Sequence, residues 1–507
     1  MQSRSSSSLG NIFFAIAVVA AAMVLSFLID NNLGMSWPSN VVRNWQDFGF
    51  LNLHGKLVYN PGGVGATSDP QVYKGMSPVC LYPVYLTLKI FSWTGLGTMA
   101  FHILLALAVI WGTWNLLGKD NFAMIVAAAA VLCPGYLRWP RLLDPNSLSV
   151  LPAIPYAVIV LWMLKRQKFS MAMALALVVL TVAFMSQNWT TAWICAPLLF
   201  LFFGMPGVNR RGLIFLFAIM AIGIPLVAVL SFAAKTGTGS NAFNPIKIIE
   251  GYTWGNLGYG EGLTTGRAFL RLAFVNGVGL FPVWVIFIYA VARYARSGGP
   301  QLLIAFAPLA LTIVDVVVMR NYFGHHPWMA GPVLLVGAIF SIALLRVPSV
   351  ETSKDVSEKI SCKWVPISGL ACFVYGFAVL LFFRTNEGNL LNLTQLIRGH
   401  TARSDTIVVL KKTDPDTAGV TDRLEEPLDR QLIVVDDIKD LPAEKGRLVI
   451  LSATNLDNSF SLTAQNAAHS KSFLNNVTGW FNRSISRRNP GDRLELPETY
   501  YLYTVER

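Results

Sequence analysis

The feature of this sequence that most constrains its fold is a series of long, uncharged apolar blocks separated by short polar stretches. Only 13% of the 507 residues are charged, whereas a soluble globular protein carries about 25%. Many of the blocks approach the roughly 20 residues that a helix needs to cross the hydrocarbon core of a bilayer. A single water-exposed globule is therefore excluded, and the sequence predicts an all-α polytopic membrane domain with about 11 transmembrane helices. The expected spans lie near 11–29, 98–117, 121–134, 147–164, 169–186, 190–206, 213–234, 273–291, 302–319, 328–345 and 364–383.

The block at 80–95 is ambiguous, because it contains Lys89 and several aromatic residues. It could be a further span or a helix lying in the membrane interface. Short cytoplasmic loops are enriched in Lys and Arg, and this bias decides between the two. If 80–95 lies flat, the basic residues of five short connections fall on the same side as Arg4. These connections contain Lys119, the run 165–168, Arg210 with Arg211, Arg293 with Arg296, and 346–363. We therefore expect the N-terminus inside.

The last part of the chain has a different composition from the rest. Of the 28 acidic residues, 17 lie after residue 384. An amphipathic helix is expected at 389–398, and β-branched or aromatic runs between polar turns predict strands at 406–410, 431–435, 447–451 and 500–505. The predicted organisation is a membrane domain over 1–384, with long outer loops at 30–97 and 235–272, and a small periplasmic α/β domain over 385–507.

Many basic residues lie on the side of the membrane that the charge bias disfavours. They are Arg43, Lys56, Lys74, Arg138, Arg141, Lys235, Lys247, Arg267, Arg271 and Arg320. Long translocated loops are not subject to this bias, so these residues need no functional role to explain their position. The alternative is an anion site at the outer membrane face. No nucleic acid is expected as a partner of a chain whose basic residues flank membrane spans.

Two outer carboxylates stand out because acids are scarce in the membrane part. Asp30 closes the first span, and Asp144 comes just before the fourth span in the segment 138–146. We expect both at one membrane depth, where partial desolvation raises the pKa of a carboxylate and lets it accept a proton from an attacking hydroxyl. Either acid alone could equally be an ordinary helix cap.

A further group of polar residues lies in the ninth expected span and between it and the tenth. Asp315 lies inside an apolar run, and an ionisable residue within a span is a candidate for function. Arg320 or a histidine is its expected partner. Tyr322, His325 and His326 form a short outer loop, although two adjacent histidines point in different directions and are unsuited to binding one metal ion together.

In its order of elements the chain resembles the GT-C glycosyltransferases, and within them the branch of protein O-mannosyltransferases and lipid A aminoarabinose transferases. The resemblance rests on a first span ending in an acid, a long outer loop, and the segments 75–83, 141–145, 187–189 and 322–327. It covers most of the chain as architecture, and 141–145 (Arg-Leu-Leu-Asp-Pro) is its most specific motif.

The resemblance implies transfer of a sugar, with inversion, from a polyprenyl-phosphate donor on the outer face of the bacterial inner membrane. It implies that an acid early in the first loop and an acid at Asp144 act at the acceptor, while basic residues hold the lipid phosphate. This chain departs from the pattern by having Met35-Ser36-Trp37 where the family's first acid usually lies. Asp30 is the nearest acid, and Asp47 remains an alternative. Arginine suits the phosphate by its bidentate geometry, and Arg141, Arg267, Arg271 and Arg320 are the foremost candidates.

Two other classes compete with this interpretation. A polysaccharide polymerase or O-antigen ligase would use an arginine-only site, and the spacing of Arg320 and Gly331 is reminiscent of such enzymes. A transporter would show broken spans and internal symmetry, and the sequence has no internal repeat. The sugar stays open, as does the acceptor, which could be a glycan, a lipid or a protein. No cofactor is certain: some GT-C enzymes use a divalent metal and others do not.

Overall fold

The computed structural model describes residues 3–28, 37–72, 81–91, 95–137, 265–294, 300–318, 330–346, 360–384, 388–418, 428–441, 447–453 and 500–504, together with 424, 455–456, 461–465 and short pieces between 154 and 180. These residues divide into two compact units. The first, here called the helical unit, holds the described residues of 3–28 and 81–380. The second, called the loop–tail unit, joins 37–72 to the described residues from 381 onward.

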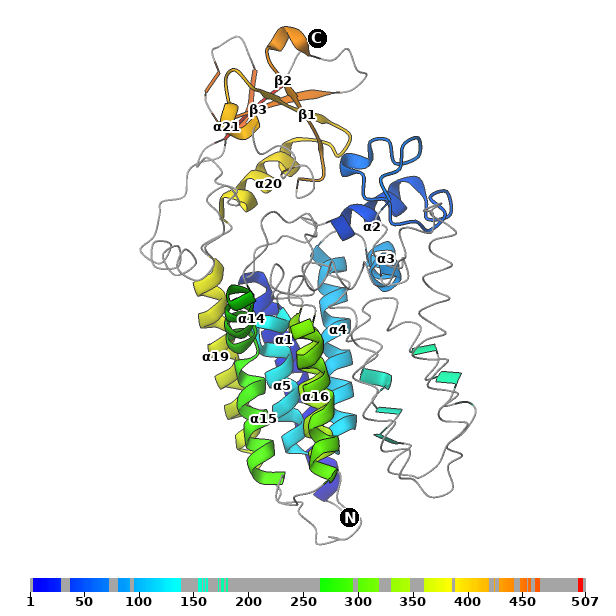
Figure 1. Cartoon of the computed structure of the whole chain (residues 1–507), viewed down its shortest axis with the longest axis vertical. Coiled ribbons are helices and arrows are strands. Elements are labelled where there is room, and N and C mark those ends of the chain that lie inside the picture. Colours follow the sequence, from blue (N-terminus) through cyan, green and yellow to red (C-terminus); the bar gives the residue numbers. More distant parts are fainter. Residues whose placement is uncertain are drawn as a thin grey trace. The chain divides into compact units, whose positions relative to one another are not determined.

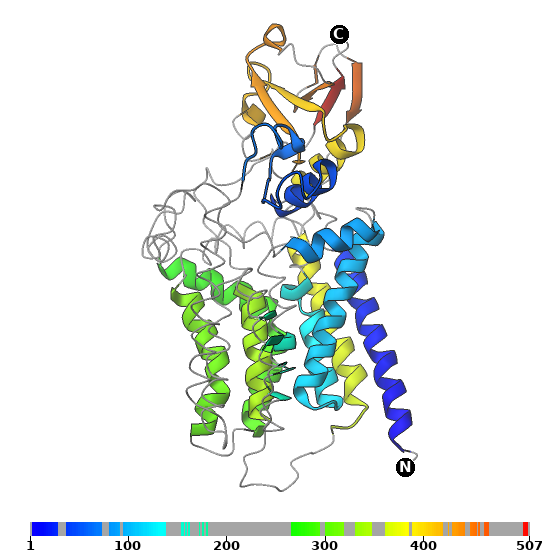
Figure 2. The same ribbon diagram turned by 90° about the vertical axis from the view of Figure 1, so that its right-hand side faces the viewer.

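Helices α1, α4, α5, α15, α16 and α19 of the helical unit run side by side as a bundle (Figures 1 and 2). The helices of this unit are α1 (Ser3–Leu28), α3 (Tyr82–Phe91), α4 (Gly95–Leu117), α5 (Asn121–Leu132), α14 (Thr265–Gly279), α15 (Phe281–Tyr294), α16 (Pro300–Val318), α18 (Ala330–Leu345) and α19 (Trp364–Arg384). Helix α18 is apolar on all sides and buried along nearly its whole length, as expected for a helix at the centre of a bundle.

The described helices account for only part of the expected spans. One helix, Ala100–Leu117, is long and apolar enough to cross a membrane, and the bent pair Ala268–Gly279 and Phe281–Tyr294 passes the same test when taken together. Shorter apolar helices occupy Gly10–Leu25, Asn121–Leu132, Ala305–Val314, Ala330–Leu345 and Trp364–Leu380. The expected spans 190–206 and 213–234 lie outside the described residues, and those at 147–164 and 169–186 are described only in short pieces. The number of about 11 spans therefore stays a prediction.

The span expected at 273–291 is bent, since two helices meet there at an angle of 83°. Helix α14 ends at Gly279, and α15 begins at Phe281 with Pro282 as its second residue. Proline has no backbone N–H and its ring clashes with a helical turn before it, so it ends one helix and starts another. We call the joint formed by residues 276–281 the elbow.

The ambiguous block at 80–95 contains the separate helix α3. Its 10 residues extend about 15 Å, half the thickness of a hydrocarbon core. Figure 2 shows α3 lying crosswise to α4 rather than continuing along it. The structure thus favours the in-plane interpretation of this block over a further span.

Arg346 contacts residues of several helix ends at one end of the bundle. Its guanidinium forms an ion pair with Asp120 and donates a hydrogen bond of 2.5 Å to the carbonyl oxygen of Leu117. It also lies over the rings of Phe122 and Tyr294, at 4.9 and 5.6 Å from their centroids. The ends of α4, α15 and α18 therefore meet the start of α5, and the basic connections at 119, 293 and 346 lie at the same end of the bundle.

Helices α5 and α19 approach each other closely near the opposite end. A Cβ atom on Gly376 would lie 2.7 Å from the backbone oxygen of Leu132 and 3.1 Å from Leu25 of α1. Only glycine permits this distance, because the contact is with backbone that cannot rotate away. Small residues of this kind let helices pack closely in a membrane.

We expect Gly376→Ala to destabilise the folded protein by about 1–3 kcal/mol, since the added methyl group forces α19 away from α5. Thermal unfolding of the detergent-solubilised protein measures this as a lower melting temperature. Gly10→Ala is the matched control, because a Cβ there meets nothing within 4 Å and alanine favours a helix. Equal melting temperatures for the two variants would contradict the close approach.

The loop–tail unit contains a five-stranded mixed sheet in the order β2-β1-β3-β5-β4. Strand β1 pairs in parallel with β2 and β3, while β5 pairs antiparallel with β3 and β4. The elements are α2 (Trp37–Phe48), η1 (Pro61–Gly63), α20 (Gly388–His400), β1 (Thr406–Leu410), α21 (Pro415–Ala418), β2 (Gln431–Val435), η6 (Ile438–Asp440), β3 (Leu448–Ser452), β4 (Ser461–Gln465) and β5 (Tyr501–Thr504).

Apolar side chains cover both faces of the sheet. Leu393 and Ile397 of α20 pack on one face against residues such as Val409 and Leu451. The helix expected at 389–398 and the four expected strands are confirmed within two residues at each end.

The segment 37–72 of the first outer loop has a fold of its own, built around asparagine side chains. Asn44 of α2 donates to the carbonyl oxygens of Val58 and Asn60 at 2.9 and 3.2 Å. Asn60 in turn donates to Val64 and Asp69 at 2.8 and 3.1 Å and accepts from the backbone N–H of Gln71. These amide side chains form hydrogen bonds with backbone groups of turns, which have no partner in a sheet or helix. The segment is therefore compact although its apolar core is small.

Candidate functional site

One end of the helical unit gathers the elements that carry the expected reactive residues. Near Gly376 the contacts described above bring together the last turns of α1 and α5. The elbow joins them, because a Cβ on Gly135 would lie 3.1 Å from the carbonyl oxygen of Gly279. We call this the elbow end of the bundle.

Side chains from two helices fix the elbow. Tyr375 of α19 donates its hydroxyl to the carbonyl oxygen of Val278 at 2.7 Å, and its ring lies 5.4 Å from that of Phe281. The indole N–H of Trp284 donates to the carbonyl oxygen of Asn276 at 3.1 Å. The carbonyl oxygen of Asn276 also accepts from the backbone N–H of Leu280 at 3.0 Å, so backbone and side chains together define the bend after α14.

Two of the expected phosphate ligands lie on α14. Arg267 and Arg271 are four residues apart and so share one face of the helix. Arg271 is only 8% exposed. A buried guanidinium needs anionic or hydrogen-bonding partners, and Arg271 has an interaction within the structure, so its role toward an anion stays a prediction from the sequence. Asp315 lies on α16, between Thr312 and the end of the helix.

Most of the other expected site residues lie outside the described residues. They are Asp30, Lys74, Arg138, Arg141, Asp144, Arg320, Tyr322, His325 and His326. The structure therefore does not test the roles expected of these residues.

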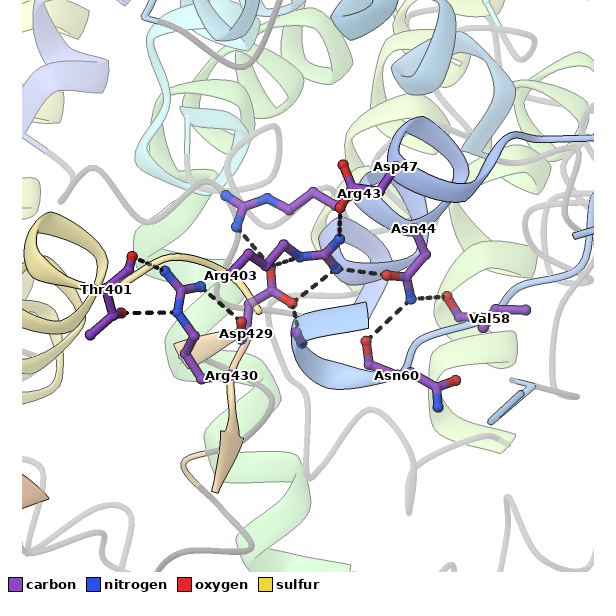
Figure 3. A network of polar contacts seen from close by, with 10 residues as sticks. Arg43, Asn44, Asp47, Val58, Asn60, Thr401, Arg403, Asp429 and Arg430 are labelled. Atoms are coloured by element: carbon purple, nitrogen blue, oxygen red, sulfur yellow. Dashed lines mark hydrogen bonds and ion pairs between the residues drawn. The ribbon is translucent and has the colours of Figure 1, made fainter. Parts of the chain in front are cut away.

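Asp47, the alternative acid, lies in a different environment. Its carboxylate forms an ion pair with Arg403 of the tail, and its side chain is 49% exposed. Both residues belong to the polar network of the loop–tail unit shown in Figure 3. This ion pair gives Asp47 a structural role within the loop–tail unit.

Asp429 is the centre of that network, and its side chain has no exposure to solvent. One carboxylate oxygen accepts from Arg43 at 2.8 Å and from Arg403 at 2.9 Å. The other accepts from Arg403 and from the backbone N–H of Gly62, both at 3.1 Å. Burial alone would raise the pKa of this carboxyl, but the charges and hydrogen bonds of Arg403 and Arg43 outweigh it and hold the pKa below its usual value.

Two further arginines surround the same carboxylate. Arg430 donates to the carbonyl and hydroxyl oxygens of Thr401 at 2.9 and 3.1 Å. Burial lowers the pKa of Arg430 to about 10, and burial also lowers that of Arg398 to about 9, with a contribution from Arg43. Both guanidinium groups are charged at neutral pH, so Asp429 is the negative centre of a strongly positive junction (Figure 3).

Sequence reasoning missed this network. Arg43 was noted only as a basic residue on the disfavoured side, and Arg403 and Asp429 were not singled out. Nothing in the spacing pairs Arg43 with Asp429, which are 386 residues apart. The one local signal is the glycine pair at 62 and 63, whose positive φ angles of 64° and 74° mark a tight turn.

No metal centre can be built from the residues that the structure describes, since they contain no group of three or more His, Cys, Asp or Glu side chains suited to one ion. Cys133, Cys362 and Cys372 are free thiols. The question of a divalent metal stays open, because most of the expected outer acids lie beyond the described ranges.

Comparison with solved structures identifies the fold as that of the GT-C membrane glycosyltransferases. The crystal structure of ArnT from Cupriavidus metallidurans bound to undecaprenyl phosphate matches over 89% of this chain and 96% of its own, with a TM-score of 0.52 and 12% identity. The apo state of the same protein matches over the same shares, with a TM-score of 0.51 and 11% identity. ArnT is a lipid A aminoarabinose transferase.

A third structure, the arabinofuranosyltransferase AftD from Mycobacteria, covers 78% of this chain but only 29% of its own. Its TM-score of 0.39, at 15% identity, is too low to indicate a common fold. No family model matches the sequence, and no curated protein matches it. The expected resemblance to the GT-C class is thus confirmed as a shared fold.

Proposed function

We propose that this protein is an inverting glycosyltransferase that moves a sugar from a polyprenyl-phosphate donor to an acceptor at the outer face of the bacterial inner membrane. The observation that carries the proposal is the meeting of α1, α5 and the elbow at one end of a GT-C fold. We assign Asp30 and Asp144 to the same site as the arginines of α14. The undecaprenyl phosphate bound by ArnT supports a polyprenyl lipid as the donor carrier here.

The proposed reaction needs two kinds of group. A carboxylate, from Asp144 or Asp30, accepts the proton of an acceptor hydroxyl as its oxygen attacks the anomeric carbon of the sugar. The bond from that carbon to the phosphate oxygen breaks, and the lipid phosphate leaves with its electron pair. Basic residues stabilise the leaving phosphate. We assign this role first to Arg141, Arg267, Arg271 and Arg320, with Lys74 and Arg138 beside them; Asp315, Tyr322, His325 and His326 are the remaining candidates for contact with substrate.

The test is release of polyprenyl phosphate by the purified full-length protein supplied with a polyprenyl-phosphate sugar and a crude envelope acceptor. Transfer from this donor, with inverted anomeric configuration in the product, supports the proposal. Transfer only from a polyprenyl diphosphate glycan would instead favour the polymerase or ligase class.

The proposal also predicts the orientation of the chain in the membrane. A topology reporter fused after Gly118 should behave as cytoplasmic, because Lys119, Arg293 and Arg346 lie at one end of the bundle and basic ends face the cytoplasm. A reporter fused after Leu391 should behave as periplasmic. A cytoplasmic tail would place every proposed catalytic residue on the wrong side and would overturn the proposed function.

A further inference from the structure

Helix α16 contains a proline in its interior, at Pro308. Proline has no backbone N–H, so the carbonyl group of Ile304 loses the donor that the helical pattern would supply, and the ring crowds the same carbonyl. In a helix within a membrane, neighbouring helices and Ser or Thr side chains compensate for backbone groups that a proline disturbs. Helix α16 and its neighbour α18 show this compensation directly after Pro308.

Two hydroxyl groups form the compensating bonds. The backbone N–H of Leu309 donates to the hydroxyl oxygen of Ser341 on α18 at 3.2 Å, outside its own helix. The hydroxyl of Thr312 donates to the carbonyl oxygen of Pro308 at 2.8 Å. A side chain that enters the hydrogen-bond ladder of a helix causes bending, and so does a Thr that bonds back to the preceding turn. We call Pro308, Leu309, Thr312 and Ser341 the proline joint.

Helix α18 is a fixed support for the proline joint. A Cβ atom on Gly337 would lie 2.8 Å from the hydroxyl oxygen of Thr312. It would also lie 3.4 Å from the Cα atom of Leu309 and from the carbonyl oxygen of Pro308. The backbone of α18 therefore touches α16 at the joint itself. Because α18 is buried along nearly its whole length and protein interiors are close-packed, α18 stays in place when α16 moves.

We propose that α16 is hinged at Pro308 and that Ser341 is the catch that holds the hinge in one position. The part of α16 before the proline stays in the bundle, and the part from Leu309 to Val318 turns against α18. Each helical amide bonds to the carbonyl group four residues before it, so the bonds that span the hinge belong to the amides of 309–312. Asp315 lies on the moving part, so bending displaces its backbone. The hinge does not depend on the proposed function.

The experiment measures amide hydrogen exchange of the full-length protein in lipid nanodiscs, with fragmentation that resolves 309–312 from 313–316. Ser341→Ala should accelerate exchange at 309–312 by about three- to tenfold, because one buried hydrogen bond is lost. The amides of 313–316 are the internal control, since their carbonyl partners move with them, and they should exchange as in wild type. Thr113→Val removes a buried hydroxyl from α4 and is the matched control variant, with wild-type exchange expected throughout 309–316.

A second variant, Pro308→Ala, distinguishes a hinge from a loss of packing. Alanine supplies the missing N–H and removes the ring, so exchange at 309–312 should be at least about threefold slower than in wild type. In this background Ser341→Ala should change the exchange by less than about twofold, because a helix with a complete ladder needs no catch. Unchanged exchange in Ser341→Ala, acceleration of equal size in both backgrounds, or equal acceleration across 309–316 would overturn the proposal.

Discussion

Asp144→Asn should reduce sugar transfer by at least about 100-fold, since a positioned general base contributes about 10²–10⁴ to a rate and an amide cannot take the proton. Pro145 directly follows the residue, and the residue before a proline is restricted to extended backbone, so the sequence predicts a firmer position for this acid than for those of the long first loop. Folding should be nearly unaffected, because even a helix-capping acid contributes only about 0.5–2 kcal/mol. An assay of purified protein with a polyprenyl-phosphate sugar measures the loss.

Asp69→Asn is the control for this variant, because Asp69 is an exposed acid of the first loop whose backbone N–H donates to Gly65 and whose backbone oxygen accepts from Asn60. It should transfer sugar at the wild-type rate. Asp30→Asn should also impair turnover. Near-normal transfer by Asp144→Asn would show that the Arg141–Pro145 resemblance is only structural.

Arg271→Gln should raise the KM for the lipid donor by about 10- to 100-fold, because a hydrogen bond to a charged group is worth about 1.5–3 kcal/mol. Because the elbow fixes the direction of α14, another residue has little freedom to take the place of Arg271. Arg271→Lys should recover part of the affinity, since lysine keeps the charge but lacks the fork that binds two phosphate oxygens. Initial rates over a range of donor concentrations give both KM values.

The control here is Arg293→Gln, at the opposite end of the bundle in the last turn of α15. Its donor KM should equal that of wild type. An unchanged KM in Arg271→Gln would remove this arginine from the donor site and leave it as a buried structural residue of α14.

The apolar blocks predicted the helices of the bundle well, because helix length and position follow directly from the absence of charge. The expected blocks at 302–319 and 364–383 correspond to α16 and α19 within two residues at each end. The elbow was missed for the same reason. Gly277, Gly279 and Pro282 interrupt the block at 273–291 without adding charge, so hydropathy continues through a bend of 83°.

In the tail, the sequence pattern predicted the strands that are rich in β-branched or aromatic residues. It missed β4, which has few of them. Strand β4 (Ser461–Gln465) has a single Thr and no Val or Ile, lies at the edge of the sheet, and changes register between Leu462 and Ala464. Its pairing is set by β5 and not by its own sequence. The Asp429 network could not be predicted from the sequence for a related reason, because only tertiary contacts bring its members together.

The expected site stays a prediction, of which the structure describes Arg267 and Arg271 on α14 and Asp315 on α16. The spacing of Arg267 and Arg271 predicts one helix face for both. The close approach of Gly135 and Gly279 does not follow from the sequence, because it depends on tertiary packing. The ion pair between Asp47 and Arg403 could not be predicted from the sequence, because the two residues lie far apart in the chain. For this reason Asp47 was kept as an alternative catalytic acid.

The separation of 386 residues between Arg43 and Asp429 has a consequence for biosynthesis. At about 5–20 residues added per second, the ribosome needs roughly 20–80 s to reach Asp429 after Arg43 has been made. Throughout that interval the loop segment 37–72 lacks its contacts with the tail, and its turn and Arg43 are accessible to proteases and chaperones. The first loop therefore completes its folding only after the last domain has been translated. In a chain truncated before Asp429, the loop would stay incompletely folded and would be recognised for degradation.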